Sequence, residues 1–222
     1  MGNRESAFRA IRERIDVAVA EREQQDGDSR PVRLVAVSKR QSVDAIRGLV
    51  GLGQRDFGEN YLQEALDKQQ ALDDLPLTWH FIGPIQSNKT RAIAAHFDWV
   101  HSVDRVKLVR RLGEQRDPEL GPLNVLIQVN IDDEASKSGA SPAEVPDIVA
   151  ACAEQPTLRL QGLMCIPRPG NTMAFDQLAE LNASLSPPLP ELSMGMSGDF
   201  EAAIAAGATI VRVGTALFGS RD

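Results

Sequence analysis

The sequence predicts an α/β protein built as a single (β/α)8 barrel of the TIM type, preceded by one extra N-terminal helix. Two observations carry this prediction. Eight short apolar runs, most of them rich in β-branched residues, alternate with segments of helical periodicity along the chain. This alternation is typical of parallel βαβ units. Eight such units close a barrel, whereas an open doubly wound sheet in a chain of 222 residues rarely needs as many.

The expected elements follow one another in a regular order. The first is a helix, because Phe8, Ile11 and Ile15 recur at spacings of three and four with charged residues between them. A polar loop is expected at 24–30. The expected strands lie at residues 32–37, 55–59, 79–83, 98–103, 123–131, 158–166, 192–196 and 209–213. A helix is expected in each interval between consecutive strands.

Several of these helices have recognisable ends. Ser42 is a typical N-cap for the helix after the first strand. The run Ser141-Pro142-Ala143-Glu144 is a capping box with proline at the first helical position. Ser197 stands where it could cap a short helix at 199–206, which Gly207 would close.

Composition narrows the class of protein. The net charge of −7 argues against nucleic acid or an anionic membrane as the main partner. The chain has no apolar run of about 18 residues and no signal-peptide pattern, so we expect a cytoplasmic protein. Cys152 and Cys165 lack metal-type spacing and are expected to be reduced core thiols, with no metal site. We expect residues 1–222 to form one domain.

A barrel of this kind carries its chemistry at the C-terminal ends of its strands. The predicted strands place there Lys39, Asn60, Gly83-Pro84, His101, Asn130, 194–197 and Gly214-Thr215. The loops after strands seven and eight often bind phosphate, and here they are rich in glycine and hydroxyl groups. The alternative is that these glycines only make tight turns and that Ser197 only caps a helix.

Two basic residues have an open interpretation. Lys39 follows an apolar strand, so its amine would be partly desolvated, and a neutral amine attacks an aldehyde to form a Schiff base. The alternative is a solvated lysine, which the adjacent Arg40 favours. Arg212 lies within the apolar eighth strand, where a charge is costly unless it is paired. It either forms an ion pair with a carboxylate or contacts a ligand.

Two further residues are interpreted more simply. His80 is expected to be a hydrogen-bonded core histidine rather than a base. Lys137 is expected to be solvated, with binding of a second anion or transfer of a cofactor as the alternatives.

Several motifs together resemble the pyridoxal phosphate homeostasis proteins. They run through almost the whole chain, at 34–39 (LVAVSK), 57–61 (FGENY), 79–89 (WHFIGPIQSNK), 136–139 (SKSG), 162–164 (GLM), 193–197 (SMGMS) and 211–219 (VRVGTALFG). The second half of the chain departs from the pattern at 168–191, which is short and carries Pro187-Pro188-Leu189-Pro190 in place of part of a helix. The pocket motifs are intact, whereas any regulatory or partner surface supplied by this region is in doubt.

The resemblance implies the barrel of the alanine racemase N-terminal domain, the fold type III arrangement that binds pyridoxal 5′-phosphate (PLP). It implies that Lys39 carries PLP as a Schiff base, and that Ser197 with the backbone of Gly214 and Thr215 holds the phosphate. It also implies that Arg212 faces the pyridine nitrogen and that Asn60 lies near the oxygen side of the ring. An arginine there disfavours a protonated pyridinium, which suits a carrier better than an enzyme that forms carbanions.

The expected function is therefore PLP homeostasis, in which the protein buffers the cofactor or delivers it to PLP-dependent apo-enzymes. We expect a monomer without catalytic residues. The alternative is an amino-acid racemase, which needs bases on both faces of the substrate carbon. The racemase relatives take one base from a tyrosine in a second, C-terminal domain. This chain is expected to lack that domain, and its sole tyrosine is Tyr61.

Overall fold

The computed structural model describes residues 2–133 and 138–219 of the chain. Its strands are β1 (Arg33–Val37), β2 (Asp56–Glu59), β3 (Thr78–Phe81), β4 (Trp99–Val103), β5 (Leu123–Gln128), β6 (Leu158–Met164), β7 (Glu191–Ser193) and β8 (Ile210–Val213). They form a closed parallel barrel in which each strand pairs with its neighbours in sequence and β8 pairs with β1. The predicted (β/α)8 architecture is confirmed.

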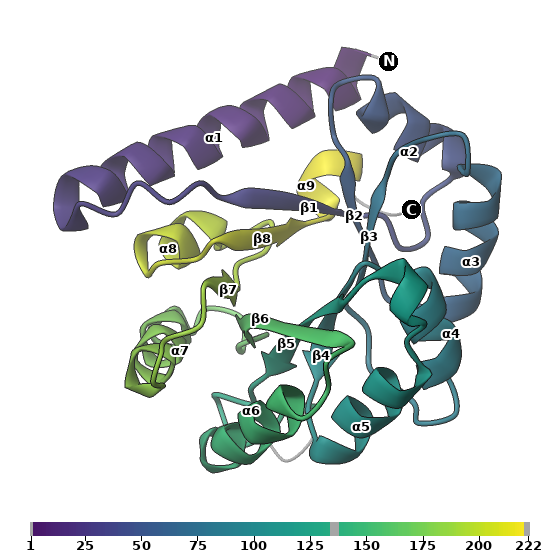
Figure 1. The fold of residues 1–222 in the computed structure, drawn as a ribbon. Helices are drawn as coiled ribbons and strands as arrows, with labels where there is room; N and C mark the ends of the chain where they lie inside the picture. Colours follow the sequence, from purple (N-terminus) through teal and green to yellow (C-terminus); the bar gives the residue numbers. More distant parts are fainter. Residues whose placement is uncertain (1, 134–137, 220–222) are drawn as a thin grey trace.

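Helices surround this barrel on the outside (Figure 1). They are α1 (Gly2–Asp26), α2 (Val43–Val50), α3 (Leu62–Ala71), α4 (Thr90–His96), α5 (Val106–Gln115), α6 (Val145–Ala153), α7 (Met173–Ser184), α8 (Phe200–Ala205) and α9 (Thr215–Phe218), with short 3-10 turns η1 (Pro118–Leu120) and η2 (Pro142–Glu144). The extra helix α1 packs against α8 and α9, across the seam where the barrel closes (Figure 1).

The alternation of side chains along each strand divides the core in two. Leu34 and Ala36 of β1 point outward into the large cluster between strands and helices. Val35, between them, belongs to a second cluster that also contains Trp99 and Ile210. This second cluster fills the barrel interior, so the barrel is a packed core rather than a pore.

The helix signals in the sequence are largely confirmed. The Ala45 amide donates to Ser42 Oγ at 3.2 Å, as expected of an N-cap. The Ser141 amide donates to Glu144 Oε2 at 2.9 Å, which completes the capping box. The first helix runs to Asp26, past the expected start of the loop at residue 24. The first residues of the helix predicted from Pro142 form the 3-10 turn η2, and the α-helix α6 begins at Val145. The turns α9 and η1 are not predicted, because elements of three or four residues have too little periodicity.

The two cysteines are confirmed as buried free thiols, and burial raises the pKa of each to about 12. Within residues 2–133 and 138–219, no helix is long and apolar enough to cross a membrane.

Candidate functional site

The backbone on both sides of Lys39 is fixed by hydrogen bonds. The Ser38 amide donates to the Gly58 carbonyl of β2 at 2.9 Å, and the Gln41 amide donates to the Ser38 carbonyl at 2.9 Å. Arg40 has a left-handed backbone with φ 60°, and its amide donates to a carboxylate oxygen of Glu64. Lys39 itself is half-buried and lies two residues after the end of β1. The chain therefore leaves the barrel at Lys39 through a rigid turn.

A cluster of charged side chains, Lys68, Glu59 and Glu64, stabilises the turn at Lys39. Lys68 Nζ donates to Glu59 Oε1 at 2.7 Å and to Glu64 Oε1 at 2.6 Å. It also donates to the Ser38 carbonyl at 2.7 Å, while the Ser38 hydroxyl donates to Glu59 Oε1 at 2.7 Å. Burial raises the pKa of Glu59, and the bonds from Lys68 and Ser38 oppose that rise. Sequence reasoning missed Lys68 and Glu59, because nothing local marks a lysine that reaches back to the preceding strand.

The loops after β7 and β8 meet, as the two-loop prediction requires. The Ala216 amide, in the first turn of α9, donates to Ser197 Oγ at 3.3 Å. The Arg212 amide of β8 donates to the Gly195 carbonyl at 3.0 Å. Gly195 has φ +89°, and a Cβ there would lie 2.6 Å from the Cβ of Ala203, so the loop can pass this close to α8 only with glycine.

The expected capping role of Ser197 is wrong. At the start of α8 no side chain caps the helix, and the Met196 amide is instead taken by Asp199 Oδ1 at 2.6 Å. The amides of Asp199 and Phe200, which Ser197 would have to cap, donate to the Met196 carbonyl at 3.2 and 3.0 Å, while the Ser197 hydroxyl accepts from the Ala216 amide of α9. The hydroxyl thus joins the two loops instead of closing one of them.

Arg212 is buried inside the barrel, with 3% of its surface exposed. Its Nη1 donates to Ser193 Oγ at 2.7 Å and its Nη2 donates to the Cys165 carbonyl at 2.9 Å. Both partners are uncharged, and burial lowers the pKa of the guanidinium. Of the two interpretations left open by the sequence, the ion pair with a carboxylate is not found among the described residues.

The expected position of His101 at the barrel mouth is wrong. The ring is fully buried within β4, where its Nδ1 lies 2.9 Å from Ser193 Oγ and its Nε2 lies 2.9 Å from Nδ1 of His80. Trp99 lies two residues earlier on the same inward face, and His80 stacks on it at 5.6 Å between ring centroids. His80 is confirmed as a hydrogen-bonded core histidine.

A cavity of about 220 Å³ opens at the C-terminal ends of β2, β3, β5 and β6. It is lined by Asn60, Ile82, Pro84, Gln128, Val129, Asn130, Ser138 and Ile166. The Asn60 Oδ1 atom is buried and has no hydrogen-bond partner in the described structure. A buried oxygen without a hydrogen-bond partner lowers the stability of the folded protein. A ligand that donates a hydrogen bond to Asn60 Oδ1 would remove this cost.

Together these positions suit a ligand with both a phosphate and an aromatic ring. Amide and hydroxyl groups from two glycine-containing loops can donate hydrogen bonds to a phosphate. The residue that precedes Lys39 is fixed against β2, and the end of β8 lies against β1, where a Cβ on Gly214 would be 3.3 Å from the Cβ of Val37. Lys137, the other lysine singled out in the sequence, lies outside the described residues, so its role stays a prediction.

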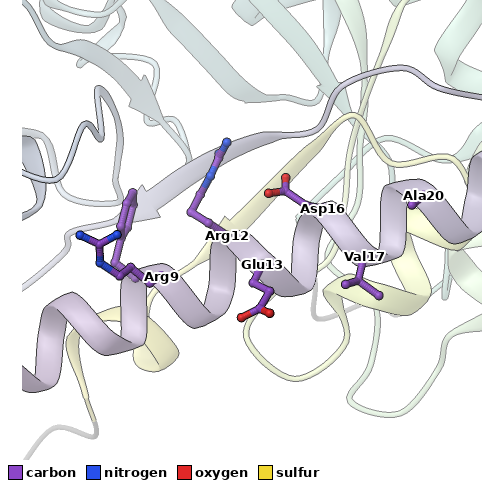
Figure 2. Close-up of a pocket in the computed structure, with 7 residues that line it drawn as sticks. Arg9, Arg12, Glu13, Asp16, Val17 and Ala20 are labelled. Atoms are coloured by element: carbon purple, nitrogen blue, oxygen red, sulfur yellow. The ribbon is translucent and has the colours of Figure 1, made fainter.

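A separate hollow of about 540 Å³ lies on the outer surface of α1. All its lining residues come from that one helix, and Figure 2 shows Arg12 and Asp16 pointing to one side of it and Glu13 and Val17 to the other. None of the expected site residues lines this hollow.

Comparison with known proteins gives consistent matches. The family described as "Alanine racemase, N-terminal domain" matches residues 8–222. A "Pyridoxal phosphate homeostasis protein" of Pseudomonas aeruginosa is 58% identical over 200 residues, covering 88% of this chain and 87% of its own length. The protein of the same name from Escherichia coli is 52% identical over 202 residues, with 86% of each chain covered.

A solved structure adds the same fold at substantial identity. PipY of Synechococcus elongatus, with PLP bound, is 40% identical and superposes with a TM-score of 0.76 over 90% of this chain and 100% of its own. The chain therefore belongs to the family of the pyridoxal phosphate homeostasis proteins, whose fold is that of the alanine racemase N-terminal domain.

Proposed function

We propose that this protein binds pyridoxal 5′-phosphate covalently as a Schiff base on Lys39 and serves intracellular PLP homeostasis by buffering the cofactor or delivering it. Three lines support the proposal. Relatives at 52–58% identity are named for this role, and a structural relative at 40% identity holds PLP. The observation that carries it is Arg212, a buried guanidinium that neutral groups hold at the end of the barrel where the two glycine loops meet.

The proposed contacts follow from these positions. Ser197 and the backbone of Gly214 and Thr215 would hold the phosphate, since the two loops already meet there. Arg212 would face the pyridine nitrogen. Asn60 would lie near the oxygen side of the ring, where its buried Oδ1 lacks a partner.

We infer that the protein is a carrier rather than a catalyst. PLP supplies an aldehyde for covalent attachment and a ring that can withdraw electrons. An arginine opposite the pyridine nitrogen disfavours protonation of that nitrogen and so weakens this withdrawal. In addition, the residues that line the mouth cavity carry only amide, hydroxyl and apolar side chains. A racemase needs acid–base groups on both faces of its substrate, and the residues that line this cavity supply no second base beside Lys39.

The cellular setting of the proposal is the cytoplasm, where PLP-dependent apo-enzymes would be the acceptors and the protein would act as a monomer. The two free buried thiols suit a reducing compartment.

The test is covalent trapping. The purified protein loaded with PLP should show a visible imine absorption band, and borohydride should remove that band while adding one pyridoxyl mass to the peptide that contains Lys39. Lys39→Ala should give neither result. Lys107→Ala, which changes an exposed lysine on α5, should behave like the unsubstituted protein. A colourless protein that stays unmodified by the cofactor would refute covalent binding.

The carrier inference is tested separately. The loaded protein, incubated with L-alanine and other amino acids, should form no D-isomer above the level seen with Lys39→Ala. Sustained formation of D-isomers would show that the protein is an enzyme.

A further inference from the structure

A continuous chain of polar side chains crosses the apolar interior of the barrel. It starts at Arg212 and continues through four residues that we call the relay: Ser193, His101, His80 and Asp56. The successive donor–acceptor distances are 2.7, 2.9, 2.9 and 3.0 Å. The first three relay residues are fully buried. Nothing in the fold requires polar groups here, because the surrounding positions are Val35, Trp99, Leu126, Met164 and Ile210.

The Asp56 end of the relay is exposed to solvent. Asp56 is the first residue of β2, at the N-terminal end of the barrel, and a quarter of its side chain is exposed. It borders a hollow of about 350 Å³ together with Arg12 and Arg33. Ser193 is the last residue of β7, at the C-terminal end of that strand. The relay therefore connects solvent at one end of the barrel to Arg212 at the other.

Hydrogen-bonding rules fix the direction of every link. The Asp56 carboxylate can only accept, so His80 Nε2 carries a hydrogen. In a neutral ring, His80 Nδ1 then accepts from His101 Nε2. His101 Nδ1 must in turn accept, and its partner is the hydroxyl hydrogen of Ser193.

The hydrogen bonds at the Arg212 end of the relay lead to the same protonation state for His101. Arg212 has only donors, so Ser193 Oγ accepts from it. The Ser193 hydroxyl is buried and needs an acceptor for its own hydrogen, and the partner that faces it is His101 Nδ1. Both histidines are therefore neutral with the hydrogen on Nε2, and every dipole points from the guanidinium toward the carboxylate.

The charges that face the relay agree with neutral rings. His80 is faced by Asp56, Arg33 and Asp98, and burial outweighs the carboxylates in lowering its pKa. Burial is the main cause that lowers the pKa of His101 well below its usual value, and the positive charges of Arg212 and Arg33 act in the same direction. Arg33 also lies over the Trp99 ring at 4.7 Å and 3.9 Å from Asp56, so it partly offsets the carboxylate.

We propose that the relay is a positioning device for Arg212, which transmits part of the negative charge of Asp56 to Ser193 Oγ and so holds the guanidinium in the orientation that meets the cofactor ring. Aligned hydrogen bonds in a low dielectric polarise one another, so a carboxylate at the far end strengthens the last acceptor. This explains how a buried cation is tolerated with only neutral groups in contact. The inference rests on the proposed function only in its second half, the effect on the cofactor.

The first test uses the protein without cofactor. The chain has three histidines, and the third, His96, is exposed on α4 and serves as the internal reference. Nitrogen-15 spectra at pH 7 should show both His80 and His101 as neutral rings protonated at Nε2. A cationic ring, or a ring protonated at Nδ1, at either position would overturn the relay. This measurement needs no variant and is independent of PLP binding.

The second test asks whether the links are coupled. Asp56→Asn keeps an acceptor for His80 and removes the charge, so the Nε2 proton resonances of both His80 and His101 should move upfield as their hydrogen bonds weaken. The control is Asp74→Asn, which removes one carboxylate of an exposed ion pair with Arg47. A change confined to His80 would show isolated hydrogen bonds and overturn the transmission of charge.

The third test links the relay to the cofactor. Ser193→Ala removes the last link without changing the formal charge, and PLP should then dissociate about tenfold more readily, as expected when a charged donor loses its buried partner. The change in dissociation constant should be accompanied by a shift of the visible band of the bound cofactor. Unchanged affinity and an unchanged band, with the histidine tautomers as expected, would refute the role of the relay at the cofactor and leave PLP binding itself intact.

Discussion

Lys68 Nζ lies 2.7 Å from the carbonyl oxygen of Ser38, the residue that precedes Lys39. This contact joins the helix after β2 to the turn after β1, and it is made by a side chain that is 7% exposed. The same ammonium group neutralises Glu59, which is completely buried. A single lysine thus supports both the electrostatics and the backbone course of the segment that presents Lys39.

Replacing this lysine should be strongly destabilising. Lys68→Met leaves Glu59 as a buried carboxylate without its cation, a change that costs about 3–5 kcal/mol in comparable sites. The measurement is the free energy of unfolding in urea. Because a protonated Glu59 resembles glutamine, the double variant Lys68→Met/Glu59→Gln should recover part of the loss. A loss below about 1 kcal/mol in the single variant would contradict the assigned role.

The stability of the protein should depend on pH through its two buried histidines. Burial lowers the pKa of His80 and His101 in the folded chain, whereas both rings take up protons near pH 6.5 when unfolded. The unfolded state therefore binds more protons below pH 6.5, and the unfolding free energy falls as the pH is lowered. The limiting slope is about 1.4 kcal/mol per pH unit for each ring.

Glu59 acts in the opposite sense over part of this range. Its pKa is raised, so the folded state binds the extra proton above pH 4.5 and loses stability as the pH rises. Asp104, whose pKa burial also raises, acts in the same sense. The contribution of the histidines is distinguished by its pH range, because unfolded histidines titrate near pH 6.5 whereas unfolded carboxylates titrate at about pH 4. Urea unfolding between pH 5.5 and 7.5 should accordingly show a net gain of stability with pH, and His96→Gln should show the same gain. A flat profile, or one that rises on acidification, would exclude neutral buried rings.

Gly83 should tolerate no side chain. A Cβ at this position would lie 2.1 Å from the carbonyl oxygen of Asn60, and backbone atoms there cannot yield as a flexible side chain could. Gly83→Ala should therefore lower stability by about 1–3 kcal/mol and displace Asn60, with weaker PLP binding as a consequence. The matched control is Gly51→Ala, where the nearest atom is 3.5 Å away. Equal unfolding midpoints for the two variants would contradict this close approach.

The sequence was most informative about the strands and helix starts, because these depend on residues close together in the chain. Alternation and capping patterns near Ser42 and Ser141 predicted real elements. The contacts that define the site are different in kind. His101 and Ser193 are 92 residues apart, and no local pattern indicates that one will accept a hydrogen bond from the other.

The predictions for Ser197 and His101 are wrong for the same reason. Ser197 has the local features of a helix cap, but the Met196 carbonyl accepts from the amides of Asp199 and Phe200, and the serine hydroxyl accepts from the Ala216 amide, 19 residues along the chain. The predicted strand puts His101 at the barrel mouth, yet the tilted strands of a barrel put it in an inner layer beside His80. In both positions a neighbour that is invisible to local patterning decides which way the side chain turns.

The pairing of β1 with β8 also has a consequence for how the protein is made. Val35 is opposite Arg212 and Ala36 is opposite Val213 in this pair. The strand that leads to Lys39 is the first of the barrel, and the strand that leads to Gly214 is the eighth. During translation the first strand emerges long before its partner exists. The proposed cofactor pocket would be completed only after β8 has left the ribosome, so capture of PLP would follow the closure of the whole barrel.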